Sequence, residues 1–161
     1  MKLLILNGPN LNLLGSREPD IYGRESYDVL CQQIYRHAET IGCTVEMFQS
    51  NHEGTLIDAI QAAQAGYSGI VINPGAYAHY SYAIYDALRA ADVPAVEVHI
   101  SDITAREPFR AVSVTAAACV KTICGHGLAG YLEAMDYLMA TASDRSDSAA
   151  PHAGCGGAAC V

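Results

Sequence analysis

The sequence predicts an α/β protein with a flavodoxin-like, three-layer fold and a five-stranded parallel sheet of strand order 2-1-3-4-5. The first reason is that five short apolar runs alternate with segments whose apolar residues recur at helical spacing. Strands that alternate with helices form parallel sheets through right-handed crossovers. The second reason is length, because 161 residues with 51% hydrophobic content are typical of one globular domain.

The first apolar run, residues 3–6, is typical of a strand that is buried on both faces of a sheet. Polar and turn-forming residues follow it from Asn7 to Gly23, where a helix would usually begin within a few residues. Ligands of open α/β sheets bind outside the carboxyl ends of the strands. The long polar loop is therefore a candidate for function, although an ordinary surface loop has a similar composition.

Helices and strands alternate after this loop. Ser26 is the expected cap of the first helix, which continues to about residue 40 and ends at Gly42. The later elements are expected as strands at residues 44–49, 69–72, 95–100 and 120–124, and as helices at 55–65, 81–91 and 128–139. Residues 1–141 are therefore predicted to form a single flavodoxin-like domain. Residues 142–161 are rich in Ser, Ala, Gly and Asp, which predicts a disordered tail.

Charge and composition exclude several classes of partner. Asp and Glu number 17 against 9 Lys and Arg, which gives a formal net charge of −8 and argues against nucleic acid or an anionic membrane. No apolar run approaches the ~20 residues of a membrane span, and the first residues lack the order of a signal peptide. The six cysteines are expected to be reduced thiols. The sequence therefore predicts a soluble, cytoplasmic protein.

No signature of a cofactor or metal is present in the sequence. Neither G-x-G-x-x-G after the first strand nor G-x-x-x-x-G-K-[ST] occurs, so neither a dinucleotide nor a nucleoside triphosphate is supported. His152, Cys155 and Cys160 in the tail have a spacing that fits no ordinary zinc site. Catalysis without a metal or a cofactor is the expectation.

Polar residues follow three strands that the predicted order makes neighbours, at residues 10–22, 73–81 and 97–110. Their loops should meet in one cleft that contains amides, imidazoles, a phenol and guanidinium groups. Ser101 lies two residues after His99, but no orienting carboxylate or elbow glycines of a hydrolase accompany this pair. The cleft is better equipped for abstracting and returning a proton than for acyl transfer.

Three segments, LNGPNLNLLGSREPDIYG, INPGAYAHYS and EVHISDITAREPFR, are similar to the signature blocks of the type II 3-dehydroquinate dehydratases, or type II dehydroquinases. The similarity runs in order from Leu6 to about Met139 and includes GHGLAGYLEAMDYL. It implies reversible dehydration of 3-dehydroquinate to 3-dehydroshikimate through an enolate, without a cofactor, in the shikimate pathway of aromatic amino acid biosynthesis.

The resemblance assigns five residues to catalysis. Tyr22 matches the base that removes a proton beside the ketone, and Arg17 matches the lid arginine whose charge can favour the tyrosinate. Asn10 matches the residue that positions a water against the enolate oxygen. His99 matches the general acid for the departing hydroxyl, and Glu97, two residues earlier on a strand, points to the same side and can orient the imidazole.

The resemblance also assigns the contacts that hold the substrate. Asn73 and the backbone N–H groups of Ile100 and Ser101 resemble the pocket for the substrate carboxylate. His79 and Arg110 resemble the contacts to its hydroxyls.

The family forms dodecamers, built as tetramers of trimers, which implies a homododecamer here. Asp86 resembles a residue that reaches the site of a neighbouring subunit, although a single helical Asp is usually just solvated.

Several positions depart from the family pattern. The family usually has Thr at the positions of Ala78 and Tyr80, Arg at that of Tyr85 and Asn at that of Asp102. The carboxylate of Asp102 would repel an anionic ligand unless it points away from the pocket. Tyr80 and Tyr85 are expected to alter packing or subunit contacts.

Three alternatives stay open at this point. The same reaction could serve quinate catabolism, or the chain could be a catalytically silent paralogue that binds a cyclic polyol acid. Schiff-base dehydration, as in the unrelated type I enzymes, would need Lys2 or Lys121, and both are expected in or at strands.

Overall fold

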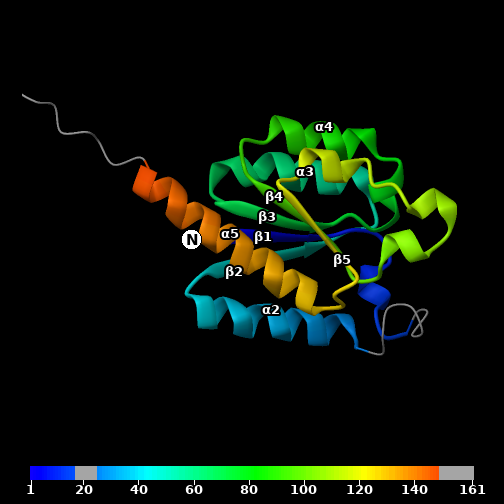
Figure 1. The fold of residues 1–161 in the computed structure, drawn as a ribbon, viewed down its shortest axis with the longest axis horizontal. Helices are drawn as coiled ribbons and strands as arrows, with labels where there is room; N and C mark the ends of the chain where they lie inside the picture. Colours follow the sequence, from blue (N-terminus) through cyan, green and yellow to red (C-terminus); the bar gives the residue numbers. More distant parts are fainter. Residues whose placement is uncertain (17–24, 149–161) are drawn as a thin grey trace, which may run out of the picture.

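The fold is a five-stranded parallel sheet between two layers of helices, and the computed structural model describes residues 1–16 and 25–148 (Figure 1). The strand order is β2-β1-β3-β4-β5. This confirms the predicted fold class and strand order. The strands are β1 (Lys2–Asn7), β2 (Thr44–Gln49), β3 (Gly69–Asn73), β4 (Ala95–His99) and β5 (Lys121–Cys124).

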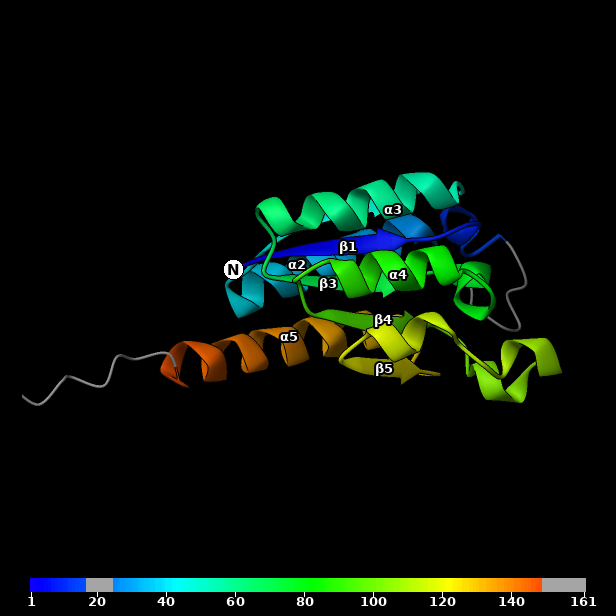
Figure 2. The same ribbon diagram turned by 90° about the horizontal axis from the view of Figure 1, so that it is seen from above.

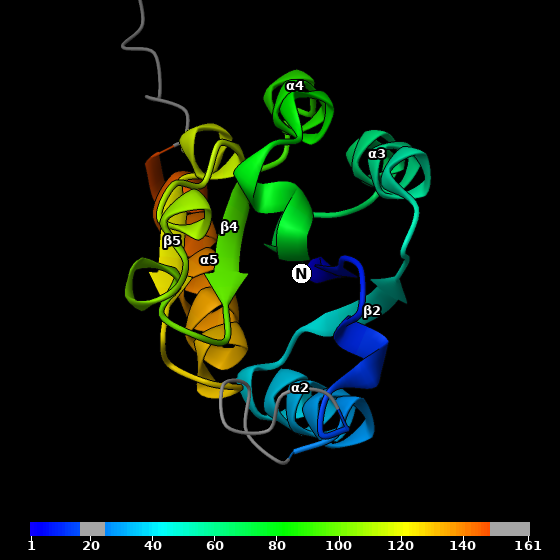
Figure 3. The same ribbon diagram turned by 90° about the vertical axis from the view of Figure 1, so that its right-hand side faces the viewer.

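Helices cover both faces of the sheet, which Figures 2 and 3 show from two further directions. One core cluster joins the sheet to α2 and α5 and the other joins it to α3 and α4. The helices are α2 (Tyr27–Ile41), α3 (Glu53–Ala62), α4 (Tyr82–Ala90) and α5 (Ala129–Ser148).

The alternating side chains of β1 supply both cores. Leu3 and Ile5 belong to the cluster under α2 and α5, and Leu4 and Leu6 belong to the cluster under α3 and α4. All four are at most 4% exposed. Each leucine or isoleucine buried in this way contributes about 1.5–3 kcal/mol to folding. β1 is thus an interior strand buried on both faces from Leu3 to Asn7, as its continuous apolar run predicted.

Capping residues place most helix ends where the sequence predicted them. The Ser26 side chain accepts a hydrogen bond from the Val29 N–H, and Gly42 ends α2 in the left-handed conformation at φ 68°. Ser81 caps α4 in the same way, through the Ile84 N–H. α3 begins at Glu53, two residues before the predicted start.

α5 continues to Ser148, which corrects the prediction of a helix end near residue 139. Residues 140–148 contain neither Gly nor Pro, so nothing in the sequence stops the helix before Pro151. Residues 149–161 lie outside the described residues, and with them His152, Cys155 and Cys160.

None of the helices in the described ranges combines the length and the hydropathy that a membrane crossing requires.

Candidate active site

A cleft opens at the carboxyl ends of β1, β3 and β4. These strands are neighbours in the sheet, with β3 between the other two. The cleft brings together residues that the sequence placed in three separate loops: Asn10, Asn73, His79, His99, Ile100, Ser101 and Arg110.

Two glycines allow the loops after β1 and β3 to pack against each other at the base of this cleft. The Gly8 N–H donates to the Asn73 carbonyl at 2.8 Å, and a Cβ at Gly8 would lie 2.3 Å from the Pro74 carbonyl oxygen. Gly75 has φ 60° and packs on Pro9. Any residue other than glycine at position 8 would push the two loops apart, because its Cβ would clash with the Pro74 carbonyl.

Asn10 follows this contact in the left-handed conformation, at φ 67°. Among the described residues it is the one residue other than glycine with a positive φ. Its N–H donates to the Asn51 Oδ1 at 2.9 Å, which holds the turn in place. Asparagine tolerates this conformation better than most residues, and such strain concentrates at functional sites.

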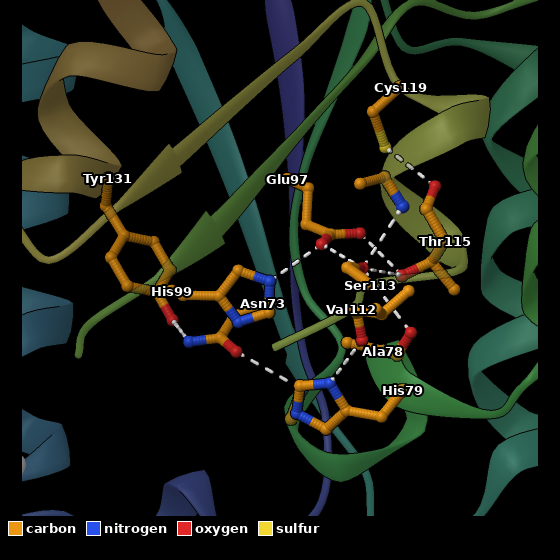
Figure 4. Close-up of polar contacts among 12 residues, drawn as sticks. Asn73, Ala78, His79, Glu97, His99, Val112, Ser113, Thr115, Cys119 and Tyr131 are labelled. Atoms are coloured by element: carbon orange, nitrogen blue, oxygen red, sulfur yellow. Dashed lines mark hydrogen bonds and ion pairs between the residues drawn. The ribbon is translucent and has the colours of Figure 1, made fainter. Parts of the chain in front are cut away.

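His99 stands at the end of β4 with its imidazole directed by Glu97. The His99 Nε2 lies 2.7 Å from the Glu97 Oε1, and the two residues are 5% and 0% exposed. The Glu97 carboxylate also accepts hydrogen bonds from Ser113 Oγ at 2.6 Å and Thr115 Oγ1 at 2.5 Å (Figure 4). With Nε2–H donating to Glu97, Nδ1 is the ring nitrogen left for a ligand in the cleft.

His79 lies beside His99, with the two rings stacked at 6.3 Å between centroids and 20° between planes. The His79 Nδ1 lies 2.8 Å from the carbonyl oxygen of Val112. A carbonyl only accepts, so Nδ1 carries the proton and Nε2 is left to contact a ligand.

The Asn73 amide is oriented by a buried network behind the cleft. Its Oδ1 accepts from the Gly75 N–H at 3.2 Å, and its Nδ2 donates to the Tyr131 hydroxyl at 2.9 Å. The Tyr131 hydroxyl in turn donates to the Asn7 Oδ1 at 2.7 Å. Tyr131 is fully buried, and burial raises the pKa of its phenol.

We expect Tyr131→Phe to lower the free energy of unfolding by about 1–3 kcal/mol, because buried amide groups of Asn7 and Asn73 lose their partner. We also expect a higher KM, since the Asn73 amide then keeps only the hydrogen bond from the Gly75 N–H and is less firmly oriented. Urea unfolding and steady-state kinetics measure both effects. Tyr137→Phe is the matched control, because no hydrogen bond of the Tyr137 hydroxyl is seen among the described residues; equal effects in both variants would contradict the assignment.

Two arginines of one loop reach the cleft. Arg110 was predicted, and its Nε donates to the Glu107 Oε2 at 3.0 Å. Arg106 also lines the cleft and lies 3.5 Å from the same carboxylate oxygen. Sequence reasoning missed Arg106, although it belongs to the same REPFR block. The two guanidinium groups carry one more positive charge than Glu107 offsets, which favours an anion in the cleft of this acidic chain.

Asp102 does not line the cleft. Its Oδ1 accepts hydrogen bonds from the Thr104 hydroxyl at 2.7 Å and the Thr104 N–H at 2.9 Å, which caps the 3-10 helix Ile103–Ala105. These hydrogen bonds hold the pKa of Asp102 below its ordinary value. The Asp102 carboxylate, which the sequence suggested could repel the substrate, therefore caps a short helix instead.

We expect Asp102→Asn to leave the KM for an anionic substrate nearly unchanged, because the exposed carboxylate is directed at Thr104. Since the folded pKa of Asp102 is lowered, its stabilising contribution is present above the unfolded pKa and is lost as the pH falls through the folded pKa. Kinetics at neutral pH and acid unfolding of the two proteins measure this. A clear fall in KM for the variant would show that Asp102 repels the substrate.

The three remaining predicted site residues are not placed in the cleft by the described part of the chain, two of them because the structure does not describe them. Tyr22 and Arg17 lie in residues 17–24, outside the described residues. Asp86 is exposed on α4, Tyr80 is exposed and Tyr85 is half-buried. Within the described ranges, no group of three or more His, Cys, Asp or Glu side chains is placed to hold a metal ion.

Comparisons with known proteins point to one family. The family model described as Dehydroquinase class II matches residues 1–139. The chain is 54% identical over 132 residues to a 3-dehydroquinate dehydratase of Clostridium acetobutylicum, which covers 82% of this chain and 92% of that protein. It is 51% identical over 146 residues to a 3-dehydroquinate dehydratase of Thermotoga neapolitana, which covers 91% and 99%.

Solved structures show the same similarity. The crystal structure of a type II dehydroquinase from Butyrivibrio crossotus matches with a TM-score of 0.85 at 53% identity, covering 86% of this chain and 97% of that one. A type II dehydroquinase from Propionibacterium acnes matches with a TM-score of 0.83 at 43% identity, covering 86% and 96%.

Proposed function

The chain belongs to the class II dehydroquinase family, and we infer that its cleft catalyses the reversible dehydration of 3-dehydroquinate to 3-dehydroshikimate. The chain is thus a hydro-lyase. The observation that supports this reaction most directly is the buried hydrogen bond between Glu97 and His99. The His99 side chain lines the same cleft as Asn10, Asn73 and Arg110. The reaction places the enzyme in the shikimate pathway, and no observation favours the same reaction in quinate breakdown.

Substrate binding uses the cleft's fixed donors. The amide of Asn73 and the backbone N–H groups of Ile100 and Ser101 hold the substrate carboxylate, with His79 and Arg110 at the hydroxyls. Support comes from their common place in the cleft and from the hydrogen bonds that orient Asn73 and His79. Preset donors lose little entropy when the anion binds.

The first chemical step removes a proton from the carbon beside the ketone. Tyr22, as tyrosinate, accepts this proton, and the guanidinium of Arg17 stabilises the anionic phenolate before transfer. The electron pair of the broken C–H bond moves into an enolate. A water held by Asn10 donates a hydrogen bond to the enolate oxygen. Asn10 lines the cleft with its backbone in the left-handed conformation, which supports this role.

The second step expels the hydroxyl on the carbon that carries the carboxylate. The enolate reforms the ketone, its electrons form the new C=C bond, and the C–O bond breaks. His99 as imidazolium gives its Nδ1 proton to the departing hydroxyl, which leaves as water, while Glu97 holds Nε2–H. Transfer of a proton from the Tyr22 phenol back to the His99 imidazole restores the enzyme, so the atoms and charges balance.

The predicted reaction is tested by adding 3-dehydroquinate and following the absorbance of the enone product. We expect the absorbance to grow. Tight binding of 3-dehydroquinate without any enone would instead favour the silent paralogue.

A lysine Schiff base is the alternative chemistry. Lys2 is the first residue of β1 and Lys121 is the first residue of β5. Both therefore lie at the amino ends of the strands, and the cleft lies at the carboxyl ends. Lys2 is also paired with Glu46 at 2.9 Å. We expect full activity to remain after incubation with 3-dehydroquinate and borohydride followed by removal of both. Inactivation would support the Schiff base.

We further propose that the chain assembles as a homododecamer, a tetramer of trimers, in the cytoplasm. Asp86 on the exposed side of α4 would then reach a neighbouring subunit's cleft. Tyr80, just before this helix, and Tyr82, its first residue, are 59% and 69% exposed and supply apolar surface for a contact. Free thiols at Cys31, Cys43, Cys119 and Cys124 are compatible with a reducing compartment. Light scattering tests the assembly, and a monomeric mass would contradict it.

A further inference from the structure

One short segment, residues 112–115, hydrogen-bonds to His79 and to Glu97, the residue that orients His99. We refer to it as the clamp segment. Its Val112 carbonyl accepts the proton of His79 Nδ1 at 2.8 Å. Its Val114 N–H donates to the Ala78 carbonyl at 2.7 Å, next to His79 in the chain. The segment is thus tied to the loop that carries His79, and the same segment supplies two hydroxyl groups to the carboxylate behind His99 (Figure 4).

The two hydroxyls give each oxygen of the Glu97 carboxylate a hydrogen-bond donor. Ser113 Oγ lies 2.6 Å from Oε1 and 3.4 Å from the Ala78 carbonyl, so its single proton goes to the nearer, charged acceptor. Thr115 Oγ1 donates to Oε2 at 2.5 Å. With His99 Nε2 on Oε1, the carboxylate accepts three hydrogen bonds in a region where Glu97 and Thr115 are both 0% exposed.

We propose that Ser113 and Thr115 are positioning residues, which hold the Glu97 carboxylate so that His99 presents its Nδ1 proton to the departing hydroxyl. This inference rests on the proposed function. The terminal torsion of a glutamate is soft, and hydroxyl donors on both oxygens prevent the carboxylate from turning. Oε1 therefore stays in line with Nε2. The consequence is large, because a misplacement of about 1 Å in a catalytic group can lower the rate ~10²-fold.

A purely structural role of the two hydroxyls gives a different result when His99 is replaced. If Thr115 acts through His99, its removal should matter only while His99 is present, because interacting residues are not additive. If Thr115 only stabilises the fold, its removal should have the same effect with or without His99. A double-mutant cycle on kcat separates these roles.

Thr115→Val keeps the side-chain shape and removes the hydroxyl. We expect kcat for 3-dehydroquinate to fall about 10-fold or more, a part of the ~10²–10⁴-fold contribution of a positioned acid, with KM little changed. Thr115→Ser restores the hydroxyl and should recover most of kcat. In a His99→Asn background, Thr115→Val should cause little further loss.

Ser81→Ala is the matched control. It removes another buried hydroxyl, which caps α4 and makes no contact with Glu97. We expect it to lower the unfolding temperature without changing kcat at a temperature where the protein is folded.

Two results would overturn the inference: full kcat in Thr115→Val, or an equal loss of kcat in the wild-type and His99→Asn backgrounds. If Thr115→Val does not fold, Ser113→Ala provides the same cycle through the other hydroxyl. A wild-type chain without turnover would overturn the proposed function itself. Wild-type turnover with an unaffected Thr115→Val would overturn only the role of the clamp segment.

Discussion

Replacing Tyr22 with Phe is expected to lower kcat at least ~100-fold, the scale of a removed acid–base group, while leaving ligand binding largely intact. The ring is kept and only the hydroxyl is lost, so the shape of the loop should change little. Enone appearance from 3-dehydroquinate measures turnover, and calorimetry with a non-reacting cyclic polyol acid measures binding.

The control for this substitution is Tyr35→Phe on α2, where the tyrosine is 48% exposed and distant in sequence from every cleft loop. We expect kcat of this variant to equal that of the wild type. Normal turnover in Tyr22→Phe would leave the assigned base without support. A parallel loss of binding and turnover would show that Tyr22 holds the substrate rather than removing its proton.

Replacing His99 with Asn is expected to lower kcat about 10²- to 10⁴-fold, the contribution of a positioned general acid, with a smaller change in KM. Asparagine can still donate a hydrogen bond toward Glu97 but has no proton to give to a departing hydroxyl. His37→Asn is the control, because His37 pairs with Asp136 between α2 and α5 and does not line the cleft. A His99→Asn variant with nearly normal kcat would remove His99 from the second step.

Most of the fold was predictable because it follows from local sequence. Apolar runs mark the strands, and Ser26, Gly42 and Ser81 mark helix ends through hydrogen bonds that span only three or four residues. The end of α5 was not predictable in this way. Its last turns have the composition of a tail, and only packing or the next proline distinguishes the two.

The part of the site that lies on a strand was predictable, because side chains two residues apart on a strand point to the same face of the sheet. Glu97 and His99 share one side of β4, and their side chains meet as this spacing predicted. Ser113, Thr115 and Tyr131 were missed because their contacts depend on the path of the chain. The hydroxyls of Ser113 and Thr115 reach back 16 and 18 residues to Glu97, and Tyr131 reaches 58 residues to Asn73. The sequence around each of these residues contains no pattern that predicts a contact with a residue so far away in the chain.

The separate roles of Tyr22 and His99 are best distinguished by a primary isotope effect, measured on kcat with deuterium on the carbon beside the ketone. In Tyr22→Phe the C–H bond should break slowly, so the isotope effect should be large. In His99→Asn the proton should leave and return before the slow loss of the hydroxyl, so the isotope effect should be clearly smaller. An isotope effect in His99→Asn that equals or exceeds that of Tyr22→Phe would contradict a phenolate base and an imidazolium acid acting in successive steps.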